Sequence, residues 1–129
     1  MVRSFFKRHL IPNLDRWEEN HLVDRGFWNL AGAAGLLCPT VPEAYGGPGL
    51  DFRYNAVVTE ELAYAGSSAS LPLQSDIIAD YLVLYGNEEQ KRAYLPGMVS
   101  GELVAAVAMT EPSVGSDLKA IRTSARRDG

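Results

Sequence analysis

The feature that most constrains the fold of this chain is a change of sequence pattern after Gly101. Residues 1–101 carry apolar residues at helical spacing, interrupted by glycine, proline and serine, which favours a series of short helices. Residues 103–109 (LVAAVAM) and 121–125 (IRTSA) instead have the apolar and β-branched residues of strands and no helix caps. Because two short strands are not stable alone, the sequence predicts a mainly helical domain over 1–102. We expect the first one or two strands of an incomplete β domain over 103–129.

Caps and breakers predict where the helices begin and end. Pro12 predicts a kink or a break in the apolar stretch 2–21. Asp24 and Asp51 are suitable N-cap residues for two further helices. The segment 38–49 contains three prolines and three glycines and must therefore be a loop.

Two more helices are expected after the GSSAS stretch at residues 66–70. The first carries an apolar stripe: Leu73, Ile77, Ile78, Tyr81, Leu82 and Tyr85. The second is short and charged, begins at a capping box formed by Asn87 and Gln90, and runs toward Pro96.

Composition excludes several classes of function. The 129 residues carry a net charge of −4 and no basic stripe, which argues against nucleic acid as the main partner. The longest apolar run is far shorter than the ~20 residues that span a bilayer, so the sequence predicts no membrane span. Charged residues interrupt the N-terminal apolar residues, so it predicts no signal peptide either. A single cysteine excludes an internal disulfide and favours a cytoplasmic location. Two histidines and one cysteine, widely spaced, form no pattern for a metal site.

The stretch AMTEPSVGSD at 108–117 has the composition of a binding loop. Pro112 fixes one backbone angle and removes a donor, and Gly115 permits close approach of another molecule. Such a turn leaves several backbone N–H groups free beside the hydroxyls of Thr110 and Ser116. These donors suit a heteroaromatic edge or a phosphate.

The residues of this loop, taken alone, favour a structural explanation over a binding site. Thr110 and Ser116 could bond only to the turn itself, with Asp117 capping it. Elsewhere the residues favour structural roles: the pairs Glu60–Glu61 and Glu88–Glu89 as surface charge, and Cys38 as a small buried residue.

Six segments, taken in order, resemble the N-terminal half of acyl-CoA dehydrogenases. They are WEENHLVDRGFWNLAGAAGLL (17–37), VPEAYGGPGLDF (41–52), TEELAYAGSS (59–68), YGNEEQKRAYLPGMVSGE (85–102), AMTEPSVGSDL (108–118) and IRTSA (121–125). The resemblance covers essentially the whole chain. It implies an N-terminal helical domain followed by a middle β-barrel domain and a C-terminal four-helix domain.

The resemblance also implies an activity. Members of this family use FAD to oxidise an acyl-CoA thioester to the trans-2-enoyl-CoA: a glutamate removes the α-proton and the β-hydrogen leaves as hydride to the flavin. Electrons then pass to an electron-transfer flavoprotein, and the full-length protein is expected to be a homotetramer or homodimer. The catalytic glutamate falls outside this chain, so no catalytic residue is assigned here and residues 1–129 alone are expected to be inactive.

By position, the resemblance assigns FAD contacts to the loop and to the residue before it. They are Val107, Ala108, Met109, Thr110, Glu111, Pro112, Gly115 and Ser116. Met109 would rest against the flavin ring, Thr110 would bond near its N5/O4 edge, and Ser116 would also touch the acyl-CoA. The helix face with Ile77, Ile78 and Tyr81 would border the acyl channel, although ordinary core packing would explain these residues equally well.

Two positions depart from the family pattern. Position 107 is valine where some members have an aromatic residue, and position 114 is valine where alanine is usual; neither change removes a hydrogen-bonding group. Two alternatives stay open: a related acyl-CoA oxidase or nitroalkane-type oxidase, and a helical interaction module without flavin chemistry.

Overall fold

The computed structural model describes residues 1–128, most of which before Gly101 are helical. The α-helices are α1 (Val2–His9), α2 (Leu14–Asn20), α3 (Arg25–Ala33), α4 (Arg53–Tyr64), α5 (Ala79–Tyr85) and α6 (Glu88–Ser100). A π-helical turn, Leu73–Ile78, leads directly into α5. Short 3-10 turns lie at Ile11–Asn13, Glu43–Tyr45 and Leu118–Ala120.

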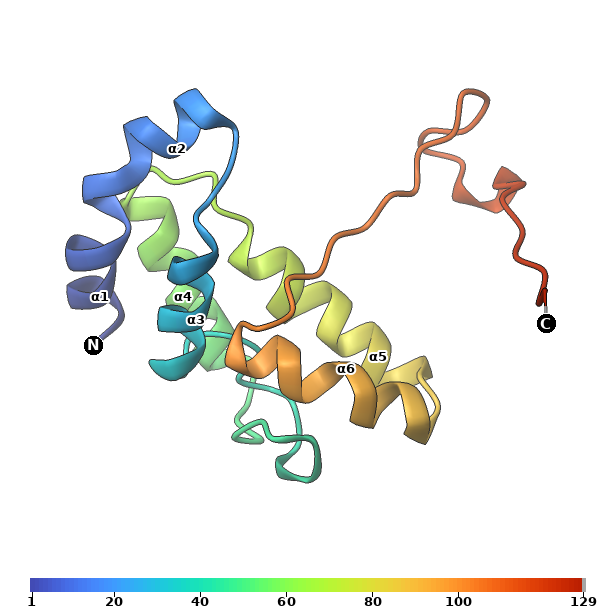
Figure 1. Ribbon diagram of the computed structural model, residues 1–129, viewed down its shortest axis with the longest axis horizontal. Coiled ribbons are helices and arrows are strands. Elements are labelled where there is room, and N and C mark those ends of the chain that lie inside the picture. The colour runs from blue at the N-terminus through green and yellow to red at the C-terminus, as the bar shows by residue number, and fades with distance from the viewer. Residues whose placement is uncertain (129) are drawn as a thin grey trace.

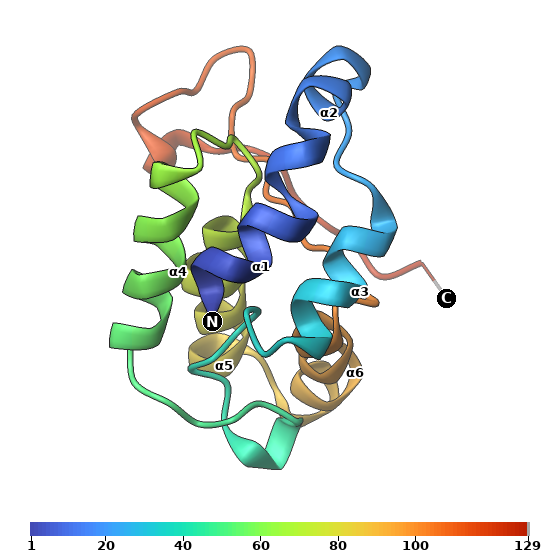
Figure 2. The ribbon, with the colours of Figure 1, turned by 90° about the vertical axis from the view of Figure 1, so that its left-hand side faces the viewer.

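The helices pack around one apolar core. Helix α1 contacts α4, α3 contacts α6, and α5 contacts α6 (Figures 1 and 2). Phe27 stands at the centre of an aromatic cluster, with its ring centroid 5.1 Å from that of Trp17 and 5.8 Å from that of Phe5. The largest fully buried apolar side chains are Phe6, Leu10, Leu36, Leu37, Leu71 and Leu95.

Most expected helix boundaries are confirmed. Pro12 lies in the 3-10 turn Ile11–Asn13, so the apolar stretch 2–21 forms two helices rather than one. The N-cap residue of α4 is Phe52 and not Asp51 as expected, although the Asp51 carboxylate accepts the Arg53 N–H at 3.0 Å just before the helix. Asp24 is the N-cap residue of α3, but its carboxylate pairs with Arg16 instead of capping the helix.

The predicted capping box is present at the start of α6. The Asn87 side chain accepts the Gln90 N–H at 2.8 Å, and the Gln90 side chain accepts the Asn87 N–H at 2.9 Å. Helix α6 continues through Pro96 to Ser100, however, so the short helix that we expected is longer. Pro96 removes one internal hydrogen bond, but Leu95 and Met98 on either side of it are buried in the core and keep the helix in place.

The expected apolar stripe of residues 73–85 is only partly the buried face. Ile77 and Tyr81 are 44% and 57% exposed, and Tyr85 also faces outward. The buried positions are instead Gln74, Ser75 and Ala79. In a π-helical turn each hydrogen bond joins residues five apart instead of four, so there are more residues per turn than in an α-helix. Residues chosen at a spacing of 3.6 therefore do not all lie on the same face here.

After Gly101 the chain leaves the helices as an extended segment (Figure 1). The expected strands at 103–109 and 121–125 have no pairing partner among residues 1–128, where the β-type pairing is a single isolated bridge between Glu111 and Val114. A strand needs a neighbour for its backbone groups, and the described residues supply none. Within residues 1–128, no helix is long and apolar enough to cross a membrane.

Candidate functional site: the loop after the helical domain

The candidate loop begins from a tight junction between α3 and α6. Gly101 ends α6 with φ +79°, and a side-chain carbon there would lie only 2.1 Å from the Trp28 carbonyl oxygen. A side-chain carbon at Gly32 would likewise lie 2.2 Å from the Ser100 carbonyl oxygen. The two glycines therefore allow the helix ends to approach closely, and this contact sets where the extended segment starts.

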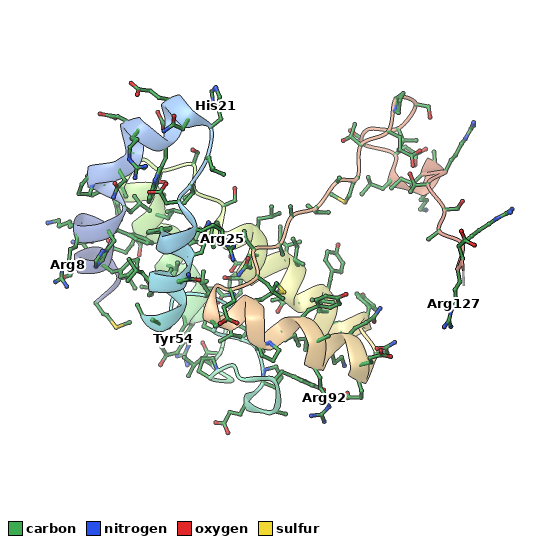
Figure 3. The ribbon with its side chains drawn as sticks, viewed as in Figure 1. Arg8, His21, Arg25, Tyr54, Arg92 and Arg127 are labelled. Carbon is green, nitrogen blue, oxygen red and sulfur yellow. The ribbon has the colours of Figure 1, made fainter. Side chains whose placement is uncertain are left out.

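Four hydrogen bonds hold the first residues of that segment, one of them from the Glu102 N–H to the Ser100 hydroxyl at 3.3 Å. The Arg25 guanidinium donates to the Glu102 carbonyl, and the Leu103 N–H donates to the Gly97 carbonyl at 2.9 Å. The Ala105 N–H donates to the side-chain oxygen of Gln74 at 2.9 Å. Arg25 lies beside the segment where it crosses the helices (Figure 3).

The loop itself is a compact turn closed by two backbone bonds. The N–H groups of Glu111 and Val114 each donate to the other residue's carbonyl at 3.0 Å. Pro112 is the second residue of this turn, where its fixed φ is favourable. Val114 is buried within the loop.

The Glu111 carboxylate ties the loop to the chain that follows it. It accepts the N–H groups of Arg122 at 3.0 Å and Thr123 at 2.7 Å, together with the Thr123 hydroxyl. These donors, the Thr123 hydroxyl first, hold the pKa of Glu111 below its usual value because they stabilise the ionised form. The side chain of Glu111 thus has a structural role here, and its backbone N–H and carbonyl are used in the two turn-closing bonds with Val114.

The other candidate groups of the loop are free. Among residues 1–128, the hydroxyls of Thr110 and Ser116 and the N–H groups of Met109, Thr110, Gly115 and Ser116 have no protein partner. Met109 is 47% exposed, and a side-chain carbon at Gly115 would meet no atom within 4 Å. The structural explanation of the two hydroxyls is therefore wrong: Glu111 and the backbone close the turn, and the hydroxyls are left available.

Asp117 has a smaller role than the structural explanation gave it. It precedes the 3-10 turn Leu118–Ala120, and its backbone carbonyl accepts the Ala120 N–H at 3.1 Å. Its carboxylate makes no capping bond.

The residues expected to border an acyl chain lie on a different element. Ile77 and Tyr81 are on the outer face of the π-turn and α5, whereas Ile78 is half-buried against the core. The loop lies apart from α5 (Figure 1). The structure thus offers two open surfaces, an apolar helix face and a loop with free donors, and does not bring them into contact.

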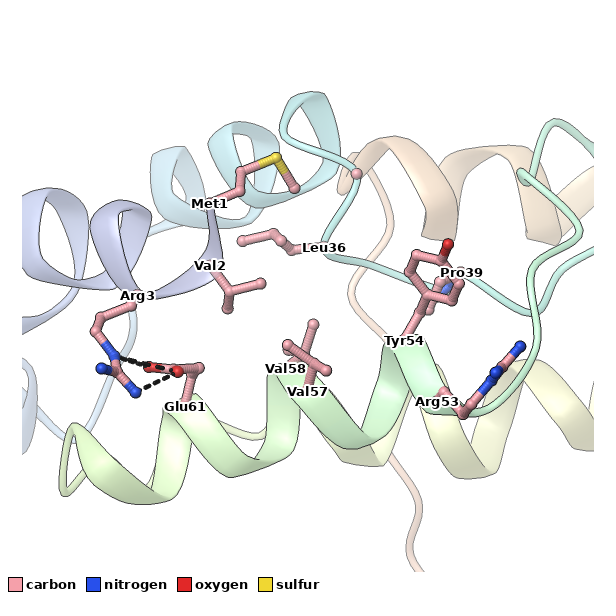
Figure 4. A pocket seen from close by; sticks show the side chains of 11 residues that line it. Met1, Val2, Arg3, Leu36, Pro39, Arg53, Tyr54, Val57, Val58 and Glu61 are labelled. Atoms are coloured by element: carbon pink, nitrogen blue, oxygen red, sulfur yellow. Dashed lines mark hydrogen bonds and ion pairs between the residues drawn. The ribbon is translucent and has the colours of Figure 1, made fainter.

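The two larger cavities that the structure describes lie away from this loop. One, of about 760 Å³, lies between α1 and α4 and is lined by Val2, Leu36, Tyr54 and Val57, with the Arg3–Glu61 ion pair at its edge (Figure 4). The other, of about 830 Å³, is lined by residues including Trp17, Trp28, Ser67–Ser70, Val104 and Ala106. Neither is lined by the loop 107–116.

The remaining candidate nucleophile is unsuited to chemistry. Cys38 is fully buried, as expected, and burial raises the pKa of its thiol to about 11. A thiol with such a pKa stays protonated near neutral pH and is a poor nucleophile.

The comparison with known proteins decides what kind of chain this is. The family described as "Acyl-CoA dehydrogenase, N-terminal domain" matches residues 1–102. The chain belongs to the acyl-CoA dehydrogenase family. This agrees with the helical fold of residues 1–101 and with the family expected from the sequence.

The acyl-CoA dehydrogenases to which this chain is similar are much longer proteins. The mitochondrial long-chain specific acyl-CoA dehydrogenase of Sus scrofa is 43% identical over 129 residues, which are 99% of this chain and 30% of that protein. The acyl-CoA dehydrogenase structure of Geobacillus kaustophilus is 46% identical, with a TM-score of 0.87 over 92% of this chain and 32% of that one. The Bacillus anthracis acyl-CoA dehydrogenase complexed with FAD is 39% identical, with a TM-score of 0.82 over 91% of this chain and 21% of that one. This chain therefore spans about a third or less of each of these relatives.

Two positions that shape the site did not stand out in the sequence. Gln74 was hidden in an apolar stripe, and its burial follows from the π-turn. The role of Gly101 depends on the distant Trp28. A polar residue inside an otherwise apolar stripe was the available signal for Gln74.

Proposed function

We propose that this chain is the N-terminal part of an FAD-dependent acyl-CoA dehydrogenase that oxidises acyl-CoA thioesters to trans-2-enoyl-CoA. The observation that carries the proposal is the loop 107–116 in a chain of this family, because the hydroxyls of Thr110 and Ser116 and the N–H groups of Met109, Thr110, Gly115 and Ser116 are unpaired among residues 1–128. We assign residues 1–102 to the N-terminal helical domain and 103–129 to the start of the middle β domain. The FAD in the Bacillus anthracis relative supports the choice of cofactor.

The loop residues fit a flavin by their chemistry. Bound FAD would supply a hydride acceptor, and the loop supplies exposed donors and an exposed Met109 side chain. The residues that we propose to hold the cofactor are Val107, Ala108, Met109, Thr110, Glu111, Pro112, Gly115 and Ser116. Because the Glu111 carboxylate is occupied by Arg122 and Thr123 and its N–H by Val114, we assign its contact to the backbone carbonyl, which can accept a second hydrogen bond.

Each free group has a distinct role in this proposal. Thr110 would donate a hydrogen bond to the polar edge of the ring, which favours the more negative reduced state. Gly115 lets a diphosphate approach the backbone, since no atom stands where its side chain would be. Ser116 would donate to the same diphosphate and contact the acyl-CoA.

The apolar wall of the acyl site is assigned to the outer face of the π-turn and α5. Ile77 and Tyr81 are exposed in the described residues and are therefore free to contact an acyl chain. Ile78, half-buried, would contribute from the edge of this face. The acyl group itself is not assigned, because relatives that match this chain include long-chain specific and isovaleryl-CoA dehydrogenases.

The remaining parts of the reaction are assigned outside this chain. We propose that the glutamate base lies in the longer protein, that an electron-transfer flavoprotein accepts the electrons, and that the full protein is a homotetramer or homodimer. A reducing, cytoplasmic location is proposed from the single thiol, which is buried.

The proposal is tested with the full-length protein. We expect a yellow protein whose flavin absorbance bleaches when an acyl-CoA is added anaerobically, with transfer of electrons to an acceptor dye. A full-length protein that takes up no FAD on reconstitution would contradict the proposal. Rapid reoxidation of the reduced flavin by oxygen would identify an oxidase instead.

The role of the loop is tested by Thr110→Val against Thr110→Ser. The valine variant has nearly the same shape but no hydroxyl, so we expect slower flavin reduction, by about tenfold or more, and a lower flavin potential. The serine variant keeps the hydroxyl and should stay close to the parent. Equal rates and potentials in both variants would remove Thr110 from the site.

A further inference from the structure

Gln74 occupies an unusual position between three elements. Its side chain is fully buried, and both of its polar atoms are used. The side-chain nitrogen donates to the Met98 carbonyl at 2.8 Å, and the side-chain oxygen accepts the Ala105 N–H at 2.9 Å. Met98 is in the last turn of α6, where backbone carbonyls lack helical partners. One amide therefore joins the π-turn, the end of α6 and the extended segment.

The bond to Ala105 is the last one between the helical body and the loop. Within residues 1–128, no hydrogen bond joins residues 106–128 to residues 1–102; the bonds beyond Ala105 are all internal to the loop region. From Ala105 the extended chain reaches Thr110 in five residues, about 16 Å. A small change in the direction of the backbone at Ala105 would therefore move Thr110 by a larger distance.

The same short helix carries the apolar face assigned to the acyl chain. Gln74 and Ile77 lie in one π-turn, and Tyr81 follows in α5, which continues the turn without a break. The π geometry turns Gln74 and Ser75 into the core while Ile77 points out. One rigid element thus presents the acyl wall on one side and holds the flavin segment on the other.

We propose that Gln74 is a positioning residue that sets the placement of the flavin-contacting loop relative to the acyl-binding face of α5. The inference rests on the proposed function for what the loop and the face bind. It follows that loss of the Gln74 amide changes the distance between acyl group and flavin without removing any group that touches either. Such a change lowers the rate of the redox step more than it weakens substrate binding.

The test compares Gln74→Met with Ser75→Ala in the full-length protein. Methionine has similar length and no amide, so it removes both bonds of Gln74. Ser75 is the neighbouring buried residue, and its hydroxyl accepts the Cys38 N–H at 2.9 Å. Loss of that bond also leaves a buried N–H unpaired, but it does not touch the extended segment. Ser75→Ala therefore controls for the loss of a buried hydrogen bond, because it leaves the hydrogen bond to the extended segment in place.

Two measurements decide the outcome. Hydrogen exchange of the peptide 104–110 should accelerate in Gln74→Met, by about tenfold or more, and stay unchanged in Ser75→Ala. Anaerobic flavin reduction by acyl-CoA should slow by about tenfold to 100-fold in Gln74→Met, with FAD content kept and KM within about twofold. Ser75→Ala should reduce its flavin at the parental rate.

A third variant covers the case in which Gln74→Met does not fold. Gln74→Glu keeps an acceptor for Ala105 but, when ionised, sets a negative charge against the Met98 carbonyl. Protonation restores a donor at that place, so the flavin reduction rate relative to the parent should recover as the pH falls. A structural role alone predicts no such recovery.

Three results would overturn the proposal. They are unchanged exchange at 104–110 in Gln74→Met, faster exchange with an unchanged flavin reduction rate, and an equal slowing in Ser75→Ala. In a full-length protein that holds no flavin, the function proposed above fails, whereas the exchange result still decides whether Gln74 positions the segment.

Discussion

At the scale of single residues, Glu111 shows how an exposed carboxylate can order a loop. Its oxygens accept two backbone N–H groups and a hydroxyl from residues 122–123, eleven and twelve positions later in the chain. The two free hydroxyls on either side of it, of Thr110 and Ser116, are displayed by this arrangement. The sequence alone could not tell these roles apart, because all three side chains are polar and lie within one short turn.

Acidification should open this loop. The pKa of Glu111 is lowered from 4.5 in the folded chain by the Thr123 hydroxyl and the two N–H groups. A lowered carboxyl pKa contributes stability above the unfolded value, and this contribution is lost as the pH falls through the folded value. We therefore expect the protection of the Arg122 and Thr123 amides, taken relative to their intrinsic exchange rate at each pH, to fall as the pH drops below 4.5, while helix α6 keeps its protection.

Glu111→Gln provides the comparison for that titration. It should show little protection of the same two amides already at pH 7, with protection factors that do not change further between pH 5 and pH 3. Undiminished protection factors of these amides in the parent at pH 2, measured by NMR, would contradict the role given to the carboxylate.

At the scale of elements, the contact between α3 and α6 depends on the absence of side chains. Gly101→Ala would place a carbon 2.1 Å from the Trp28 carbonyl at φ +79°, so either the backbone or the helix contact must shift. We expect a loss of about 2 kcal/mol or more in the free energy of unfolding. Gly26→Ala is the matched control, because nothing lies within 4 Å of that position.

Urea unfolding of both variants measures the difference. In Gly26→Ala we expect an unchanged or slightly higher midpoint, since alanine is the better helix former by up to ~1 kcal/mol. Equal midpoints for the two variants would mean that the α3–α6 contact is looser than the structure shows.

The sequence predicted correctly those helix boundaries that depend only on residues close together in the chain. The Asn87–Gln90 capping box and the breaks at Pro12 and 66–70 depend on neighbouring residues and were found from the sequence. The continuation of α6 through Pro96 was not, because it depends on the burial of Leu95 and Met98. The π-turn was missed for the same reason: its buried Gln74 and Ser75 bond to residues distant in the chain.

At the scale of the whole molecule, the chain divides into a packed body and an extended segment. The buried side chains of the core cluster come from residues 6–98, whereas after Ala105 the chain has no hydrogen bond to the body within residues 1–128. For a protein of residues 1–129, we expect slow amide exchange in α3 and α6 and fast exchange at 106–110. In the full-length protein the same peptide should be protected, because the middle domain proposed here would pair with it.

The comparison of the two lengths checks the proposed domain division. Residues 1–129 alone should bind FAD weakly or not at all and catalyse no oxidation, since the base and the other walls of the site are assigned elsewhere. Micromolar FAD binding by this chain in calorimetry, or equally slow exchange at 106–110 in both lengths, would argue against the division at residue 102.

The sequence by itself determined the family, the helical character of the first hundred residues, the position of the change at Gly101 and the identity of the candidate loop. These features rest on local patterns: caps, breakers, apolar spacing and a short motif. Only the tertiary structure decided which face of residues 73–85 is buried, that Glu111 orders the loop, and that Gln74 connects the helices to it. Each of these depends on contacts between residues eleven or more positions apart, and their energies are set by burial in the folded chain.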